Sequence, residues 1–164
     1  MVRSLCESRK SGNFAAELRN FEYFRLKTFE ELGVSEEIRR AIEELGFESP
    51  MPVQEEVIPY LLGNRNDVIA LAQTGTGKTA AFGIPVLQKL DPKSRETQAL
   101  VLSPTRELCL QIADDLKDFS KHMKGVNIVA VYGGTSIENQ IRAFRHGAQI
   151  IVATPGRAID LMHR

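Results

Sequence analysis

Several features that would place this chain in a specialised class of protein are missing from it. Tryptophan is absent, and the two cysteines, Cys6 and Cys109, are far apart and match no metal-ligand spacing. No apolar run is long enough to span a bilayer, so no membrane association is expected. The N-terminus also lacks the apolar core of a secretion signal. These absences argue against a disulfide scaffold, a zinc module and a membrane protein, and they favour the reducing cytoplasm.

Net charge is also missing, since 21 basic residues balance 21 acidic ones. A strongly basic net charge would indicate nucleic-acid binding. Because the net charge here is zero, any contact with nucleic acid must come from a local surface. Residues 1–27 carry six basic and three acidic side chains. We interpret residues 1–26 as a basic leader, which is either a solvated tail, an RNA-binding arm or a start upstream of the real domain. Residues 27–164 are expected to form one domain or part of one.

The pattern of apolar residues predicts two short helices followed by an α/β fold. The helices are expected at 35–46, with Ser35 as the N-cap, and at 52–63, with Pro52 in the first turn. Four β-branched apolar runs then predict strands buried on both faces, at 67–72, 98–103, 127–132 and 149–154. Helical patterns separate them at 78–89, 106–122 and 136–144. Such alternation predicts a doubly wound, mainly parallel sheet with ligands beyond the carboxyl ends of its strands.

The clearest motif is AQTGTGKT, residues 72–79, placed between a predicted strand and a predicted helix. That context is the one that a phosphate-binding P-loop requires. Gly75 and Gly77 allow backbone N–H groups to turn toward phosphate oxygens, and the following helix presents its positive end to them. Lys78 is expected to meet the β and γ phosphates, and the Thr79 hydroxyl to bind Mg²⁺. The loop therefore indicates a nucleoside triphosphate but does not specify the reaction.

Four further motifs narrow the interpretation. They are GFESPMPVQ (46–54), PTREL (104–108), GG (133–134) and TPGR (154–157). In this order, and together with the phosphate loop, they resemble the first lobe of a DEAD-box ATP-dependent RNA helicase, over about residues 27–164. Each motif is short, but the ordered combination is specific. The resemblance implies a RecA-like P-loop fold, binding of ATP with Mg²⁺, and ATP hydrolysis coupled to opening of RNA duplexes.

The resemblance also assigns roles to individual residues. Gln54 is similar to the glutamine that reads the adenine edge, Phe47 to the aromatic that stacks on adenine, and Phe29 to an upstream aromatic that supports the motif. The remaining nucleotide contacts implied by the loop are Gln73, Thr74, Gly75, Thr76 and Gly77, besides Lys78 and Thr79 as the catalytic pair. The residues that match the RNA-backbone surface of the family are Pro104, Thr105, Arg106, Gly133, Gly134, Thr154, Pro155, Gly156 and Arg157. Contacts of this kind hold the sugar-phosphate chain without reading bases, so RNA binding is expected to be independent of sequence.

Other parts of the helicase machinery are not found in these residues. The family's acidic Asp-Glu-Ala-Asp motif, its Ser-Ala-Thr motif and its second lobe do not occur, so we expect this stretch to be a piece of a longer parent and inactive alone. Two alternatives stay open at this point. The piece could be a non-catalytic ATP- and RNA-binding half-domain, or, less well supported, a small-molecule P-loop kinase. A DNA helicase of related fold fits the PTREL and TPGR motifs less well. The RNA, the pathway and any protein partner are not specified.

Overall fold

The computed structural model of the protein describes residues 27–64 and 66–163. Its helices are α2 (Glu36–Glu44), α3 (Pro52–Gly63), α4 (Lys78–Gln88), α5 (Arg106–Phe119), α6 (Ile137–Ala143), the 3-10 helix η2 (Phe144–His146) and α7 (Pro155–Met162). The strands are β1 (Ala99–Leu102), β2 (Ile128–Val131) and β3 (Ile150–Ala153). The predicted leader, residues 1–26, lies outside the described residues. Helix α3 has the predicted bounds, with Pro52 in its first turn, whereas Ser35 precedes α2 without a side-chain capping bond.

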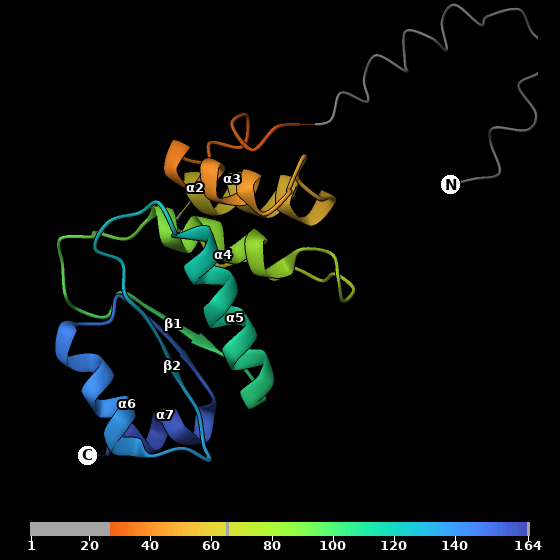
Figure 1. Ribbon diagram of the computed structural model, residues 1–164. Helices are drawn as coiled ribbons and strands as arrows, with labels where there is room; N and C mark the ends of the chain where they lie inside the picture. The colour runs from red at the N-terminus through yellow and green to blue at the C-terminus, as the bar shows by residue number, and fades with distance from the viewer. Residues whose placement is uncertain (1–26, 65, 164) are drawn as a thin grey trace, which may run out of the picture.

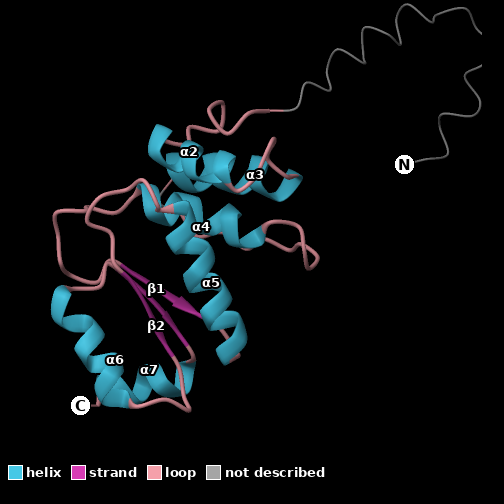
Figure 2. Ribbon diagram, viewed as in Figure 1, coloured by secondary structure: helices cyan, strands magenta, loops and turns pink. Residues whose placement is uncertain are grey.

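The three strands form one parallel sheet in the order β1–β3–β2 (Figures 1 and 2). The central strand, β3, pairs Ala153 with Leu102 of β1 on one side and with Val131 of β2 on the other. All three strands therefore end at the same level. The loops that follow them, which begin the PTREL, GG and TPGR motifs, leave the sheet side by side. The predicted parallel α/β arrangement is confirmed.

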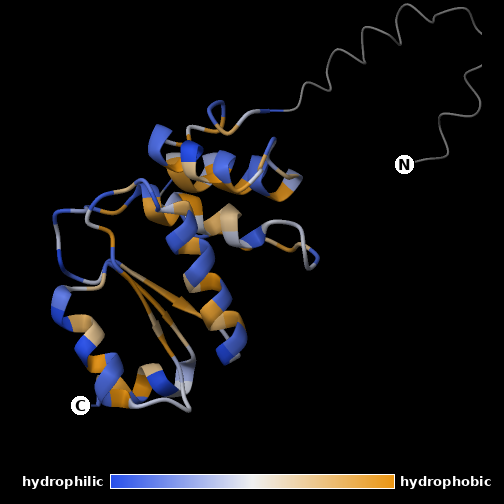
Figure 3. Ribbon diagram, in the orientation of Figure 1, coloured by the Kyte–Doolittle hydropathy of each residue, from blue (hydrophilic) through white to orange (hydrophobic). Residues whose placement is uncertain are grey.

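Helices cover both faces of the sheet. On one face Cys109 and Leu116 of α5 pack in a cluster with Ile150 and Val152. On the other face Val131 and Ala153 pack in a separate cluster with flanking apolar side chains from η2 and α7. Figure 3 shows hydrophobic residues along all three strands and alternating hydrophobic and hydrophilic residues along α5. The fold is therefore doubly wound, as predicted, and Cys109 is a fully buried core residue.

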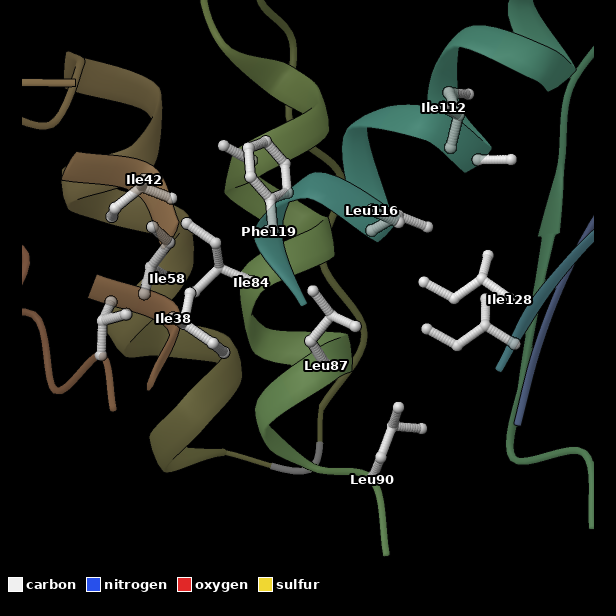
Figure 4. Close-up of a cluster of buried hydrophobic side chains, with 14 of the residues drawn as sticks. Ile38, Ile42, Ile58, Ile84, Leu87, Leu90, Ile112, Leu116, Phe119 and Ile128 are labelled. Atoms are coloured by element: carbon white, nitrogen blue, oxygen red, sulfur yellow. The ribbon is translucent and has the colours of Figure 1, made fainter. Parts of the chain in front are cut away.

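The larger part of the core lies away from the sheet, among α2, α3, α4 and α5. In Figure 4, Ile38 and Ile58 point toward Ile84 of α4, with Leu116 of α5 beyond. Gly83 lets α4 and α5 approach closely, because a Cβ atom there would lie 2.6 Å from Cδ2 of Leu116. The helix that starts at the phosphate loop is thus held by α3 and α5.

The strand predicted at 67–72 is wrong in this structure. The segment has no regular secondary structure, and Ile69 and Leu71 are 91% and 94% exposed. The expectation that β1 is buried on both faces is also wrong, since Leu100 and Leu102 are more than half exposed and Ala99 and Val101 are only partly buried. An apolar run becomes a strand only where a neighbour pairs with its N–H and C=O groups. Within residues 27–64 and 66–163, only β3 pairs with β1, and no strand pairs with 67–72.

Candidate nucleotide and RNA site

The phosphate loop turns sharply into α4. Gly77 is the N-cap of α4 with φ of 75° and Gly75 has φ of 78°, both in the left-handed region that favours glycine. Lys78 Nζ donates to the carbonyls of Ala72 (2.5 Å) and Gln73 (2.8 Å) across the loop. The Thr76 hydroxyl donates to the Gln73 carbonyl at 2.7 Å. The positive charge of Lys78 is therefore held at the loop, where phosphate oxygens could replace these carbonyls as acceptors.

Space for a ligand adjoins this lysine. An open cavity of about 590 Å³ is lined by Lys78, Gln73 and residues 70–72. Thr79 lies one residue into α4 and is half-buried, with Asp115 of α5 close enough for a side-chain hydrogen bond. Burial raises the pKa of the Asp115 carboxyl, and the bond with Thr79 opposes that rise. The loop thus fits a triphosphate, and the Thr79 hydroxyl is a suitable oxygen for a hard cation.

Gln54 is buried and is bonded to the phosphate loop itself. Its Oε1 accepts from the backbone N–H of Met51 (2.9 Å), and its Nε2 donates to the carbonyl of Gly77 (3.1 Å). The side chain has no exposed surface. The residue predicted to read adenine therefore joins the start of α3 to the start of α4, and in this conformation its amide faces protein groups.

Of the two predicted aromatics of the adenine site, Phe29 is a core residue and Phe47 is partly buried against the core. Phe29 is 7% exposed and belongs to the main hydrophobic cluster. Phe47 meets Phe119 of α5 edge to face, with ring centroids 6.2 Å apart. Both phenylalanines also line a cavity of about 410 Å³ beside α2. The packing role is thus observed, and the adenine contact stays a prediction.

The predicted RNA residues gather at the carboxyl ends of the three strands. Thr105 is the N-cap of α5, and its hydroxyl accepts from the N–H of Leu108 at 3.2 Å. Arg106 is exposed, and its guanidinium carbon lies 4.9 Å from the centre of the Tyr132 ring. Its Nη1 lies 3.5 Å from the position that a Cβ of Gly134 would take. The PTREL and GG motifs are therefore in contact.

The TPGR motif contacts the loop of the GG motif through Arg157. Its guanidinium was predicted to face RNA, but Nη1 donates to the carbonyl of Thr135 (3.1 Å) and to Oε1 of Gln140 (3.0 Å). Only 12% of the Arg157 side chain is exposed. By contrast Pro155 and Gly156 are exposed, and Thr154 is half-buried, at the N-terminus of α7. Arg157 thus joins α7 to the loop after β2.

Sequence reasoning missed three residues at this site, namely Gln140, Tyr132 and Asp115. A single glutamine or aspartate in a helical stretch forms no recognisable motif, so nothing in the sequence indicates a role for Gln140 or Asp115. Tyr132 has the pattern of a residue at the end of a strand. His122, which was assigned nothing, pairs its Nε2 with Glu44 at 2.8 Å, on the surface between α5 and α2.

The fold and the loop define a P-loop nucleotide-binding domain, and comparison with known proteins identifies its family. The family model of the DEAD/DEAH box helicases matches residues 51–164, so the chain belongs to that family. It is 55% identical over 137 residues to "ATP-dependent RNA helicase DeaD" of Escherichia coli (strain K12), a match that covers 84% of this chain and 22% of that protein. It is 50% identical over 139 residues to "DEAD-box ATP-dependent RNA helicase CshA" of Geobacillus kaustophilus, covering 85% and 29%.

Solved structures of DEAD-box proteins resemble the fold of this chain. A DEAD box protein from the hyperthermophile Methanococcus jannaschii superposes with a TM-score of 0.78 at 41% identity, covering 84% of this chain and 37% of that one. Dbp5 of S. cerevisiae, bound to RNA and ADP BeF3, superposes with a TM-score of 0.76 at 35% identity, covering 84% and 34%. The chain therefore spans about a third of these structures and a smaller share of the two sequence relatives. No helix in the described residues is long and apolar enough to cross a membrane.

Proposed function

We propose that the chain supplies the ATP site and part of the RNA site of an ATP-dependent RNA helicase, whose whole protein hydrolyses ATP to open RNA duplexes. One arrangement carries the proposal. The phosphate loop is bonded to Gln54 of the upstream motif, and the PTREL, GG and TPGR loops leave one edge of the sheet side by side. Family membership argues against the kinase alternative.

In the ATP site the chain's own groups bind and orient the triphosphate. The N–H groups of residues 75–79 and the positive end of α4 face the phosphates, and Lys78 exchanges its two carbonyl acceptors for phosphate oxygens. Mg²⁺ bound with ATP would neutralise phosphate charge, and the Thr79 hydroxyl would hold it. No group of three or more His, Cys, Asp or Glu side chains suited to a metal occurs among the described residues.

In the RNA site the chain offers backbone donors and the exposed guanidinium of Arg106. α5 and α7 both begin at the strand ends, so their N-terminal N–H groups and the exposed glycines of the GG loop can meet phosphates. Arg106 adds a positive charge. Recognition of this kind reads no bases and weakens with salt. The 2′-hydroxyls of RNA distinguish it from DNA.

Hydrolysis and strand separation belong to the whole protein in this proposal. The acidic residues that position the attacking water and the second lobe are expected in the rest of the parent, which we place in the cytoplasm. ATP and RNA then bind across both lobes and close them, and hydrolysis reopens them. A parent that binds both ligands without turnover would match the half-domain alternative instead.

The test is strand separation of a short RNA duplex by the full-length protein, comparing Lys78→Ala with Lys89→Ala. Both lysines donate to backbone carbonyls at the two ends of α4, Lys89 to that of Asn64 at 3.2 Å, so they form a matched pair. We expect Lys78→Ala to lower the ATP-dependent rate by about 10²–10³-fold, the loss typical for removal of one preorganised charge contact. Lys89→Ala should stay within about twofold. Equal rates for the two variants, or no ATP-dependent unwinding by the wild type, would overturn the proposal.

A further inference from the structure

Gln140 is a buried polar side chain that none of the recognised motifs includes. It lies on α6, is 7% exposed, and has all of its amide hydrogens bonded. Nε2 donates to the carbonyl of Tyr132 (2.9 Å) and to Oγ1 of Thr135 (2.8 Å), and Oε1 accepts from Arg157 (3.0 Å). A guanidinium can only donate and a carbonyl can only accept, so these partners fix which way the amide faces.

These bonds hold the GG loop at both of its ends. Tyr132 directly precedes Gly133, and Thr135 directly follows Gly134. The two glycines themselves are exposed, and Gly133 has no atom within 4 Å of the position that a Cβ would take. Arg157 also bonds the Thr135 carbonyl, and the Thr135 hydroxyl donates to the Tyr132 carbonyl at 3.5 Å. The amide of Gln140 bonds both anchor points directly, so it contributes to the position of the loop between them.

The same amide connects the other two RNA motifs. Arg157 of the TPGR motif bonds both Oε1 of Gln140 and the carbonyl of Thr135. Arg106 of the PTREL motif lies over the ring of Tyr132, whose carbonyl Gln140 holds. One side chain is thus common to the contacts that place all three loops relative to one another.

We propose that Gln140 is a positioning residue for RNA binding, which sets the spacing of the PTREL, GG and TPGR loops so that successive backbone phosphates meet them together. Gln140 itself touches no RNA. This inference rests on the proposed RNA-binding function. It also replaces the phosphate contact predicted for Arg157 with a structural role, because Arg157 links α7 to this amide.

The experiment uses the full-length protein and compares Gln140→Met with Gln149→Met. Gln149 is a matched control, because it is 3% exposed and also bridges backbone groups, accepting from the N–H of Asn127 (2.8 Å) and donating to the carbonyl of Ser94 (2.6 Å). It precedes β3, at the opposite end of the sheet from the RNA loops. Both variants keep side-chain length and remove a buried amide, so both should lower thermal stability.

The measurements are the KM for single-stranded RNA and the kcat at saturating RNA in RNA-stimulated ATP hydrolysis. We expect Gln140→Met to raise the KM for RNA by about tenfold, as loss of one hydrogen bond to a charged group would, with kcat and the KM for ATP within twofold of wild type. Gln149→Met should leave all three constants unchanged. Gln140→Glu provides a second variant, because its carboxylate keeps Arg157 but repels the Tyr132 carbonyl; it should raise the KM for RNA as well.

Two results would overturn the inference. One is an unchanged KM for RNA in both Gln140 variants, and the other is an equal rise in Gln149→Met, which would show a general effect of lost stability. Failure of the wild type to bind RNA is a separate result, since it would remove the proposed function on which the inference rests.

Discussion

The side-chain amide of Gln54 donates to the carbonyl of Gly77, 23 residues later, at 3.1 Å. This bond joins the upstream motif to the phosphate loop. A Cβ atom on Gly77 would lie 2.2 Å from Gln54 Nε2, so no other residue fits there without displacing the glutamine. Loop and glutamine therefore act as one unit, and the predictions below begin from that unit.

Gly77→Ala should destabilise the protein more than Gly75→Ala. Both glycines have φ near +75°, which costs about 1–2 kcal/mol for an alanine. Only Gly77 has a neighbour, since nothing lies within 4 Å of a Cβ on Gly75. Displacing Gln54 leaves buried groups unpaired, so we expect an additional loss of about 1–3 kcal/mol for Gly77→Ala in urea unfolding. Equal losses would contradict a rigid contact between Gln54 and the loop.

Gln54→Ala should reduce the preference for ATP over GTP in the full-length protein. In this prediction the amide exchanges its bonds to Met51 and Gly77 for a donor and an acceptor on adenine, and a wrong base would leave it unpaired. Because the side chain is buried against Gly77, we expect the variant to bind ATP more weakly as well. Gln88→Ala is the control, since Gln88 also bridges backbone groups at the far end of α4, bonding Ser35 and Gly33. An unchanged ATP/GTP ratio in titrations with labelled nucleotides would argue against adenine reading.

Arg106→Ala should weaken RNA binding to a similar degree for all sequences. Arg106 is exposed beside Gly134 at the ends of the strands, where a phosphate contact is expected. The slope of log Kd against log salt should fall by about one unit. Arg145→Ala, in η2, is a control that should change neither quantity. A loss confined to some RNA sequences would indicate base contacts instead.

Asp115→Asn should raise the melting temperature at pH 7. Burial raises the pKa of this carboxyl in the folded protein, so the folded state binds the proton more tightly than the unfolded one. The charged form therefore costs stability above the raised pKa, and this cost disappears as the pH falls through it toward the ordinary value of 3.8.

Melting curves between pH 7 and pH 3.5 test this, and the gain of Asp115→Asn should shrink as the pH falls. Asp114→Asn is the matched control on the neighbouring position, because Asp114 is exposed and paired with Lys117 at 2.8 Å. It should give no gain at pH 7. A gain for Asp115→Asn that stayed constant across the pH range would rule out ionisation as its cause.

Sequence reasoning succeeded where local chemistry determines the structure. The bounds of α3 follow from Pro52 and Gly63, and the places of the PTREL, GG and TPGR motifs follow from the parallel strands that precede them. It failed at 67–72, because a strand requires a partner that no local pattern supplies. The inward turn of Arg157 was missed for a related reason, since its partner Gln140 lies 17 residues away on a helix with no recognisable motif.

Coupling between ATP and RNA tests the central claim most directly. In the proposed helicase ATP and RNA both bind across the two lobes and close them, so each ligand should raise the affinity for the other, and by the same factor. The measurement is the Kd of the full-length protein for a fluorescent single-stranded RNA, with and without a non-hydrolysable ATP analogue and Mg²⁺. The account predicts RNA binding at least about tenfold tighter with the analogue, and loss of that gain in Lys78→Ala. The same RNA affinity with and without the analogue would contradict it.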